Sequence, residues 1–194
     1  MDVHWATIRH RPAHSIAGGE DCRRQPETPA GLERWGAFSD DAAVQDLYFA
    51  YGSNLSLRRL AERIPGPEPQ GPARLPGYRL VFNKRSADGS GKANLLPAPG
   101  EEAWGVLWSI SRAAWPALDG FEPGYVRSPC SVLDAGGQAR AASVYLWPGE
   151  GPEEAPYDWY LEYLLEGARE NALPPEYVRW LAGVQSRADP SRKG

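Results

Sequence analysis

Residues 48–55 of this chain read Tyr48-Phe49-Ala50-Tyr51-Gly52-Ser53-Asn54-Leu55. The aromatic residues favour an extended strand, and Gly52 permits a tight turn directly after it. Ser53 and Asn54 are common N-cap residues, and the residues that follow have helical spacing as far as Arg63. A strand that leads through a turn into a helix presents backbone N–H groups that can hold a carboxylate or a phosphate. An ordinary capped helix without a ligand explains the same residues, so the stretch alone leaves both interpretations open.

The composition is that of a globular protein with many aromatic side chains. The chain has 194 residues and is 42% hydrophobic, which is enough for one domain with an appendage. Eight tryptophans and nine tyrosines provide large surfaces that can also line a pocket. The formal charge of −4 argues against a nucleic-acid partner. No apolar run approaches the length of a membrane span, so we expect no membrane partner.

The first 45 residues differ from the rest because they show no sustained hydrophobic period, and we predict a disordered extension there. This segment holds all the histidines and one of the two cysteines, in a spacing that matches no zinc pattern: His4, His10, His14 and Cys22. We expect no metal site and no structural disulfide. Without a signal peptide before the domain, we expect a cytoplasmic protein.

The remainder of the chain alternates predicted strands with short turns and a few helices. We predict strands at residues 47–51, 78–84, 93–97, 103–110, 125–133 and 140–147. We predict helices at residues 55–63, directly after Ser111, at 156–171 and at 175–184, with a loop at 65–69 and a turn at 97–100. The elements do not alternate as βαβ units. The pattern therefore predicts an α+β domain at residues 46–185 with a curled, mostly antiparallel or mixed sheet, and a frayed tail at 186–194.

The predicted domain contains no histidine, which excludes Ser-His-Asp and Cys-His catalysis. Cys130 is accordingly expected to be a small buried side chain rather than a nucleophile. No Gly-rich phosphate loop is present, so acid–base chemistry would fall to a carboxylate supported by tyrosine hydroxyls. Glu122 is the strongest candidate because it lies on a predicted turn between a helix and a strand, where catalytic groups concentrate. A solvated surface carboxylate is the alternative interpretation of Glu122.

Four segments, in this order, resemble the γ-glutamylcyclotransferase family of the AIG2-like superfamily. The resemblance extends from about Asp46 to Val184. It rests on residues 48–55, Glu102-Ala103-Trp104-Gly105-Val106-Leu107-Trp108, Leu118-Asp119-Gly120-Phe121-Glu122 and Gly167-Ala168-Arg169-Glu170-Asn171-Ala172-Leu173-Pro174-Pro175-Glu176-Tyr177. The last segment is most similar to γ-glutamylcyclotransferases proper. The Tyr-Gly-Ser-Asn sequence differs from the Tyr-Gly-Ser-Leu sequence of the glutathione-specific branch.

The resemblance implies a small mixed, mostly antiparallel β-barrel with flanking helices. It also implies an enzyme of the lyase or acyltransferase type that needs no metal or cofactor. Such an enzyme converts a γ-glutamyl amide to 5-oxoproline and a free amine or amino acid, as in glutathione metabolism. Glu122 matches the family's general acid/base. The residues that the resemblance assigns to substrate binding are Tyr48, Phe49, Ala50, Tyr51, Gly52, Ser53, Asn54, Tyr125 and Tyr145.

Three questions stay open at the level of the sequence. The first is whether the chain is a different enzyme on the same scaffold, an amidohydrolase or a γ-glutamylamine-specific lyase, or a non-catalytic small-molecule-binding homologue. The second is the leaving group of the small-molecule γ-glutamyl substrate: an amino acid, a polyamine-like amine or a γ-glutamyl-protected intermediate. The third is whether the protein is a monomer or a homodimer.

Overall fold

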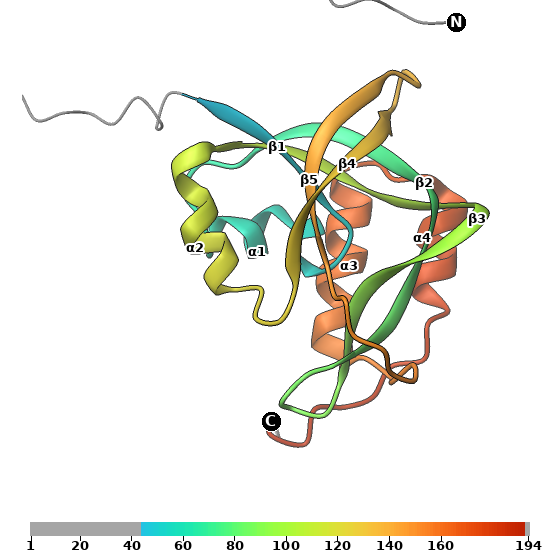
Figure 1. The fold of residues 1–194 in the computed structure, drawn as a ribbon. Helices are drawn as coiled ribbons and strands as arrows, with labels where there is room; N and C mark the ends of the chain where they lie inside the picture. The colour runs from blue at the N-terminus through green and yellow to red at the C-terminus, as the bar shows by residue number, and fades with distance from the viewer. Residues whose placement is uncertain (1–43, 193–194) are drawn as a thin grey trace, which may run out of the picture. The chain divides into compact units, whose positions relative to one another are not determined.

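The computed structural model describes residues 44–192, which fold into a β-barrel with helices around it (Figure 1). The strands are β1 (Gln45–Ala50), β2 (Glu68–Arg85), β3 (Gly91–Ser111), β4 (Val126–Asp134) and β5 (Ala139–Leu146). The α-helices are α1 (Leu57–Ala61), α2 (Trp115–Gly120), α3 (Asp158–Glu170) and α4 (Pro175–Ala182). Short 3-10 helices, η2 (Ser53–Leu55) and η3 (Arg112–Ala114), precede α1 and α2. The predicted extension, with its histidines and Cys22, lies outside the described residues apart from 44 and 45.

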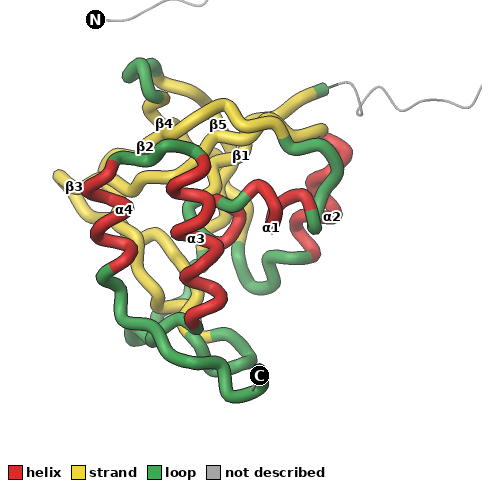
Figure 2. The backbone as a smooth tube through the Cα atoms, turned by 180° about the vertical axis from the view of Figure 1, so that it is seen from behind, coloured by secondary structure: helices red, strands yellow, loops and turns green. Residues whose placement is uncertain are grey.

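The strands close into a barrel in the order β1-β3-β2-β4-β5. Neighbouring strands are antiparallel except for β1 and β5, which pair in parallel at Tyr48 and Ser143. The helices α3 and α4 lie side by side against the outside of the strands (Figure 2). This arrangement confirms the predicted α+β class and the small mixed, mostly antiparallel barrel with flanking helices.

The hairpin of β2 and β3 differs from the prediction, which divided the same residues into shorter strands. The predicted loop at residues 65–69 already contains the start of β2, and the predicted turn at 97–100 lies inside a continuous β3. Pairing passes from Pro76 opposite Glu102 to Tyr78 opposite Pro97, so residues 98–101 bulge out opposite Gly77. Proline and glycine, which usually end a strand, here occupy bulges in a ladder that continues beyond them.

The core fills the barrel and the space beneath the helices. Its largest fully buried side chains include Phe49, Trp108, Leu60, Leu164 and Leu181. β1 contributes heavily because it pairs with β3 on one edge and β5 on the other. The turn that follows β1 is therefore anchored at its start by a strand with neighbours on both sides.

The other anchor of this turn is α3, which packs directly on its backbone. A Cβ atom added at Gly167 would overlap the carbonyl group of Leu55, so only glycine allows this approach. The Asn171 side-chain amide donates to the Leu55 carbonyl oxygen at 3.2 Å. Gly167 and Asn171, which belong to the last of the four family segments, thus hold the turn that residues 48–55 form.

The start of α1 also differs from the prediction. Ser53 and Asn54, which we predicted as N-caps, lie in η2, and α1 begins only at Leu57. The N-cap is Ser56, whose side-chain oxygen accepts a hydrogen bond from the Arg59 amide at 3.2 Å. Ser53 and Asn54 are both buried, so their side chains are available for contacts inside the protein rather than for capping α1.

Residues of the segment that we predicted to be a frayed tail, 186–194, make contacts with the start of α3. The Asp158 amide donates to the Arg187 carbonyl oxygen at 3.0 Å, and the Trp159 indole donates to Asp189 at 2.9 Å. Between residues 44 and 192, no helix combines the length and the apolar character that crossing a membrane requires.

Replacement of Gly167 by alanine should destabilise the protein, because the new methyl group must displace the backbone at Leu55. Overpacking of this kind typically costs about 1–3 kcal/mol, and we expect that loss in the free energy of unfolding measured with urea. Gly183→Ala is the matched control, since its added Cβ has no neighbour closer than 3.4 Å. Equal stability of the two variants would contradict the direct packing of α3 on the turn.

Candidate active site

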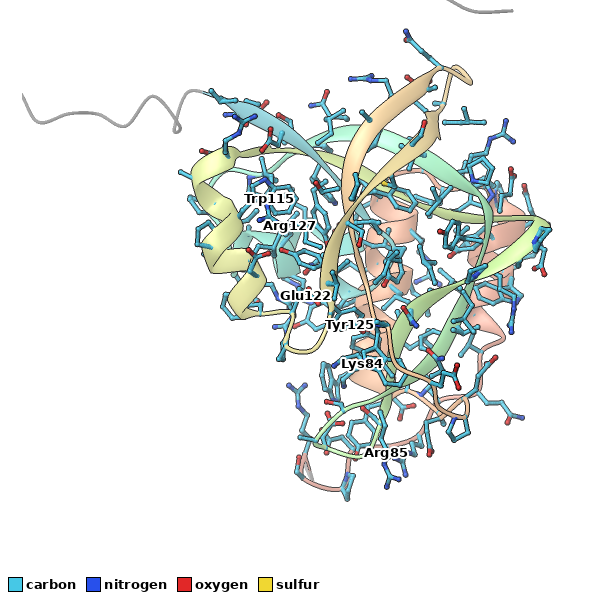
Figure 3. All side chains as sticks on the ribbon, in the orientation of Figure 1. Lys84, Arg85, Trp115, Glu122, Tyr125 and Arg127 are labelled. Atoms are coloured by element: carbon cyan, nitrogen blue, oxygen red, sulfur yellow. The ribbon has the colours of Figure 1, made fainter. Side chains whose placement is uncertain are left out.

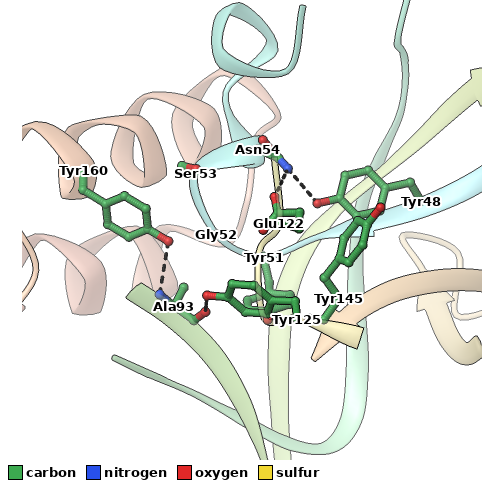
Figure 4. Close-up of a pocket in the computed structure, with 10 residues that line it drawn as sticks. All are labelled: Tyr48, Tyr51, Gly52, Ser53, Asn54, Ala93, Glu122, Tyr125, Tyr145 and Tyr160. Atoms are coloured by element: carbon green, nitrogen blue, oxygen red, sulfur yellow. Dashed lines mark hydrogen bonds between the residues drawn. The ribbon is translucent and has the colours of Figure 1, made fainter. Parts of the chain in front are cut away.

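A pocket opens where the turn after β1 meets β3, β5, α3 and the turn between α2 and β4 (Figure 4). The hollow and the open solvent at its mouth together have a volume of about 290 Å³. Eight of the ten residues predicted for the site line it: Tyr48, Tyr51, Gly52, Ser53, Asn54, Glu122, Tyr125 and Tyr145. The other two, Phe49 and Ala50, are fully buried in the core beside it.

Glu122 occupies a tight turn that carries the chain from α2 into β4. Its amide donates to the Asp119 carbonyl oxygen at 3.2 Å, and its carbonyl oxygen accepts from the Tyr125 amide at 3.0 Å. The side chain is only 14% exposed. Its Oε1 atom accepts from Asn54 Nδ2 at 3.0 Å and from Arg63 Nη1 at 2.9 Å. One oxygen of the carboxylate is therefore held by two donors, one from η2 and one from the residues just after α1.

Burial raises the pKa of Glu122 above its usual value of 4.5, because an ionised carboxylate loses its hydration in the pocket. The charge of Arg63, the Asn54 hydrogen bond and the charge of Lys84 oppose this rise, and burial outweighs them. Arg63 is itself only 10% exposed. Glu122 is thus poised to exchange a proton closer to neutral pH than an exposed glutamate.

Asn54 connects Glu122 to the tyrosines of the pocket. Its Nδ2 atom donates both to Glu122 and to the Tyr48 hydroxyl oxygen, at 2.9 Å in the latter case (Figure 4). Its Oδ1 atom is buried and has no hydrogen-bond partner among the described residues. One amide nitrogen of Asn54 therefore ties the Glu122 carboxylate to the Tyr48 hydroxyl.

The tyrosines are held by one another, by Trp115 and by fixed hydrogen bonds. The rings of Tyr48, Tyr145 and Trp115 meet edge to face, with centroids 5.8–6.2 Å apart. The Tyr145 hydroxyl donates to Asp119 Oδ1 at 2.5 Å, and the Tyr51 hydroxyl to the Tyr145 carbonyl oxygen at 2.6 Å. These contacts make the wall of the pocket rigid.

The hydroxyls of these tyrosines stay protonated. Burial raises the pKa values of Tyr48, Tyr51, Tyr125 and Tyr145 well above their usual 10. A tyrosine that cannot ionise is a hydrogen-bond donor and acceptor but not a base. Among the residues that line the pocket, Glu122 is therefore the group suited to proton transfer.

Two further lining residues, Ala93 and Tyr160, were not predicted. Tyr160 lies on α3, and its hydroxyl oxygen accepts from the Ala93 amide at 3.1 Å. A Cβ atom at Gly52 would lie 3.2 Å from this oxygen, a tight contact that would push the Tyr160 hydroxyl away from the turn. In the sequence, Tyr160 belongs to the apolar face of an amphipathic helix, and nothing distinguishes it from a core aromatic residue.

The described residues contain no cluster of three or more histidine, cysteine, aspartate or glutamate side chains that could hold a metal ion. Cys130 lies half-buried on β4, outside the pocket. Burial raises the pKa of its thiol to about 11, so the reactive thiolate is disfavoured.

The chain is similar to known proteins over most of the described residues. Residues 102–181 match the AIG2-like family. Human gamma-glutamylcyclotransferase is 32% identical over 148 residues, which cover 72% of this chain and 78% of the human protein. The bovine protein of the same name is 32% identical over 160 residues, which cover 75% and 84% of the two chains. A solved structure described as a gamma-glutamyl cyclotransferase superposes with a TM-score of 0.70 at 30% identity, covering 74% of this chain and 90% of its own. The chain belongs to the γ-glutamylcyclotransferase family of AIG2-like proteins.

Proposed function

We propose that this protein cyclises a γ-glutamyl amide to 5-oxoproline and releases the amine, with Glu122 as the general acid/base. The observation that carries the proposal is the position of Glu122: a nearly buried carboxylate, held by Asn54 and Arg63, in a pocket walled by neutral tyrosines. The relatives named gamma-glutamylcyclotransferase support the same chemistry.

The protein has two tasks in this reaction. It must hold the substrate in a folded conformation, and it must carry protons between the two nitrogen atoms. The α-amine of the glutamyl group attacks its own γ-carbonyl carbon, forms the C–N bond of a five-membered ring and expels the amine. Because nucleophile and electrophile belong to one molecule, holding the folded conformer can supply up to about 7–11 kcal/mol of the barrier reduction. Glu122 and the tyrosines around it form the walls of the site in which that conformer is held.

The protons balance through a single carboxylate. The α-ammonium group gives up two protons on its way to the lactam nitrogen, and the leaving nitrogen gains both and departs as an ammonium ion. Glu122 accepts each proton in turn and passes it on, so it returns to its starting state. General acid–base catalysis of this kind contributes about 10²–10⁴ in rate.

The neighbouring groups have complementary parts in this mechanism. Asn54 donates to Glu122 through Nδ2 and keeps the carboxylate in place for the α-ammonium group. The amides of Gly52 and Asn54 lie at the start of η2, where backbone N–H groups lack partners within the helix. These amides hold the α-carboxylate or the oxyanion that develops on the γ-carbonyl oxygen. Tyr125 and Tyr145 close the wall around the folded substrate.

The proposal keeps two further expectations from the sequence, which concern the cofactor and the binding partner. The reaction uses the chain's own side chains and no cofactor, and its partner is a small γ-glutamyl molecule. An amidohydrolase on the same scaffold would release glutamate, because water rather than the α-amine would attack the carbonyl. The identity of the product therefore separates the two enzymes.

Glu122→Gln should lower the release of 5-oxoproline from γ-glutamyl amides by about 10²–10⁴, because glutamine cannot carry the proton. The variant should keep its fold by circular dichroism. Glu102→Gln is the matched control, since Glu102 lies in an exposed pair with Arg74 outside the pocket. Turnover of Glu122→Gln within a few-fold of the wild type, or glutamate as the wild-type product, would overturn the proposal.

Arg63→Gln should move the acid limb of the kcat/KM profile to higher pH. Arg63 lowers the pKa of Glu122, so its loss lets burial raise that pKa further. Glu122 must be ionised to accept the first proton, and activity therefore falls at a higher pH in the variant. Arg74→Gln removes an exposed cation of another pair and should leave the limb in place. If the acid limb lies at the same pH in the wild type, Arg63→Gln and Arg74→Gln, Arg63 does not lower the pKa of Glu122.

A further inference from the structure

One tyrosine of the pocket is held from behind by a carboxylate that does not line the pocket. Asp119 lies near the end of α2, and its Oδ1 atom accepts a hydrogen bond from the Tyr145 hydroxyl at 2.5 Å. A hydroxyl that donates to a carboxylate typically lies about 2.5–2.7 Å from it, in a stronger bond than one between neutral groups. Asp119 therefore determines where the Tyr145 hydroxyl proton points.

Arg127 and Trp115 keep Asp119 in place. The Nε atom of Arg127 lies 3.4 Å from the same Oδ1 atom, and its guanidinium group lies 4.4 Å from the centre of the Trp115 ring (Figure 3). Trp115 in turn meets Tyr145 edge to face, with ring centroids 6.2 Å apart. The four side chains thus form a closed ring of contacts behind the pocket wall. In its ion pair with Arg127, the Asp119 carboxylate has lone pairs but no proton to donate.

The consequence is a fixed polarity of the Tyr145 hydroxyl. A tyrosine hydroxyl has one proton to donate and lone pairs with which it accepts. Because the Asp119 carboxylate can only accept, it takes the Tyr145 proton. Burial and this hydrogen bond both raise the pKa of Tyr145 well above 10, so the proton stays on the hydroxyl. The Tyr145 hydroxyl therefore offers a lone pair, not a proton, to a molecule in the pocket.

Tyr145 lies on the side of the pocket where proton transfer takes place in the proposed reaction. Its ring meets the Tyr48 ring at 5.8 Å, and the Tyr48 hydroxyl shares the Asn54 amide with Glu122. The N–H donors of a γ-glutamyl amide are its α-ammonium group and its amide, and only the first is charged. An oxygen whose proton is bound by a carboxylate is polarised toward negative charge, which favours the cation.

We propose that Asp119 is a positioning residue, which binds the Tyr145 hydroxyl proton and so makes Tyr145 the acceptor for the α-ammonium group. The inference rests on the proposed function. The ammonium group has three N–H bonds, and two of its protons leave through Glu122. Tyr145 accepts from the third, which stays on the lactam nitrogen. Without Asp119, the hydroxyl proton can turn into the pocket and face the N–H donors of the amine.

Two ligands that differ only in the α-ammonium group test this contact. L-Glutamate has the group and glutarate lacks it, and calorimetry measures the binding of both without turnover. The wild type should bind L-glutamate more tightly than glutarate. Asp119→Ala should reduce this ratio of affinities by roughly tenfold, the effect of one hydrogen bond to a charged group. Glu102→Ala should leave the ratio unchanged, since Glu102 forms an ion pair of similar exposure outside the pocket.

Asp119→Asn is the conservative variant. Arg127 can only donate, so it should turn the amide oxygen of the new asparagine toward itself and toward Tyr145. That oxygen can still accept the Tyr145 proton. We therefore expect Asp119→Asn to recover most of the affinity ratio that Asp119→Ala loses. Both substitutions leave in place the backbone hydrogen bond from the Glu122 amide to the Asp119 carbonyl oxygen.

Tyr145→Phe separates an action through the hydroxyl from support of the fold. This variant should lower the affinity ratio, and it should lower kcat/KM for release of 5-oxoproline from γ-glutamylglycine. Adding Asp119→Ala to Tyr145→Phe should cause no further loss in either quantity, because the group through which Asp119 acts is already absent. A carboxylate that supports the fold, or that attracts the ammonium group through space, would still cause a loss in that background.

Four results would overturn the proposal. A wild type that binds L-glutamate no more tightly than glutarate, or an unchanged ratio in Asp119→Ala, would show that Tyr145 does not accept from the α-ammonium group. A further loss in the double variant would show that Asp119 does not act through the hydroxyl. Asp119→Asn no better than Asp119→Ala would make the charge responsible. The same change in Glu102→Ala would reduce the effect to general charge. Release of 5-oxoproline by the wild type tests the proposed function separately, because the binding measurements need no turnover.

Discussion

The buried pair of Arg63 and Glu122 joins two turns that lie 59 residues apart in the chain. Asn54 adds a second donor to the same carboxylate oxygen, so the turn after β1, the segment after α1 and the turn before β4 meet at one atom. Removing one partner of such a pair leaves an uncompensated charge in a low-dielectric site, which is costly. The carboxylate therefore keeps a fixed position, and the pocket is built around that position.

The rest of the fold supplies the rigidity that this contact needs. β1 carries the turn and is paired on both edges, while α3 presses on the turn from outside through Gly167 and Asn171. The tyrosine hydroxyls have fixed partners and stay neutral because they are buried. Proton transfer is thus concentrated on one group, and the surrounding side chains give shape and hydrogen bonds without competing for the proton. A reaction within one substrate molecule suits such a site, since orientation accounts for much of its barrier.

The sequence predicted those features that depend on neighbouring residues or on a family pattern. The turn at Gly52 and the position of Glu122 between a helix and a strand belong to this group. Arg63 could not be predicted as the partner of Glu122, because a long-range ion pair has no local signal. Tyr160 was hidden for another reason, since an aromatic residue on the inner face of a helix resembles any core residue. The long β2–β3 hairpin was divided wrongly because prolines and glycines that usually end strands occupy bulges there.

The most direct test of this account is the titration of the Glu122 carboxyl itself. Carbon-13 NMR of protein labelled at the glutamate side chains follows that carboxyl, and the Glu122→Gln spectrum assigns its signal. We predict a pKa above 4.5, as burial requires, and a midpoint that coincides with the acid limb of kcat/KM. A Glu122 pKa at or below 4.5, or one that is unrelated to the activity profile, would contradict the claim that this buried carboxylate is the proton carrier.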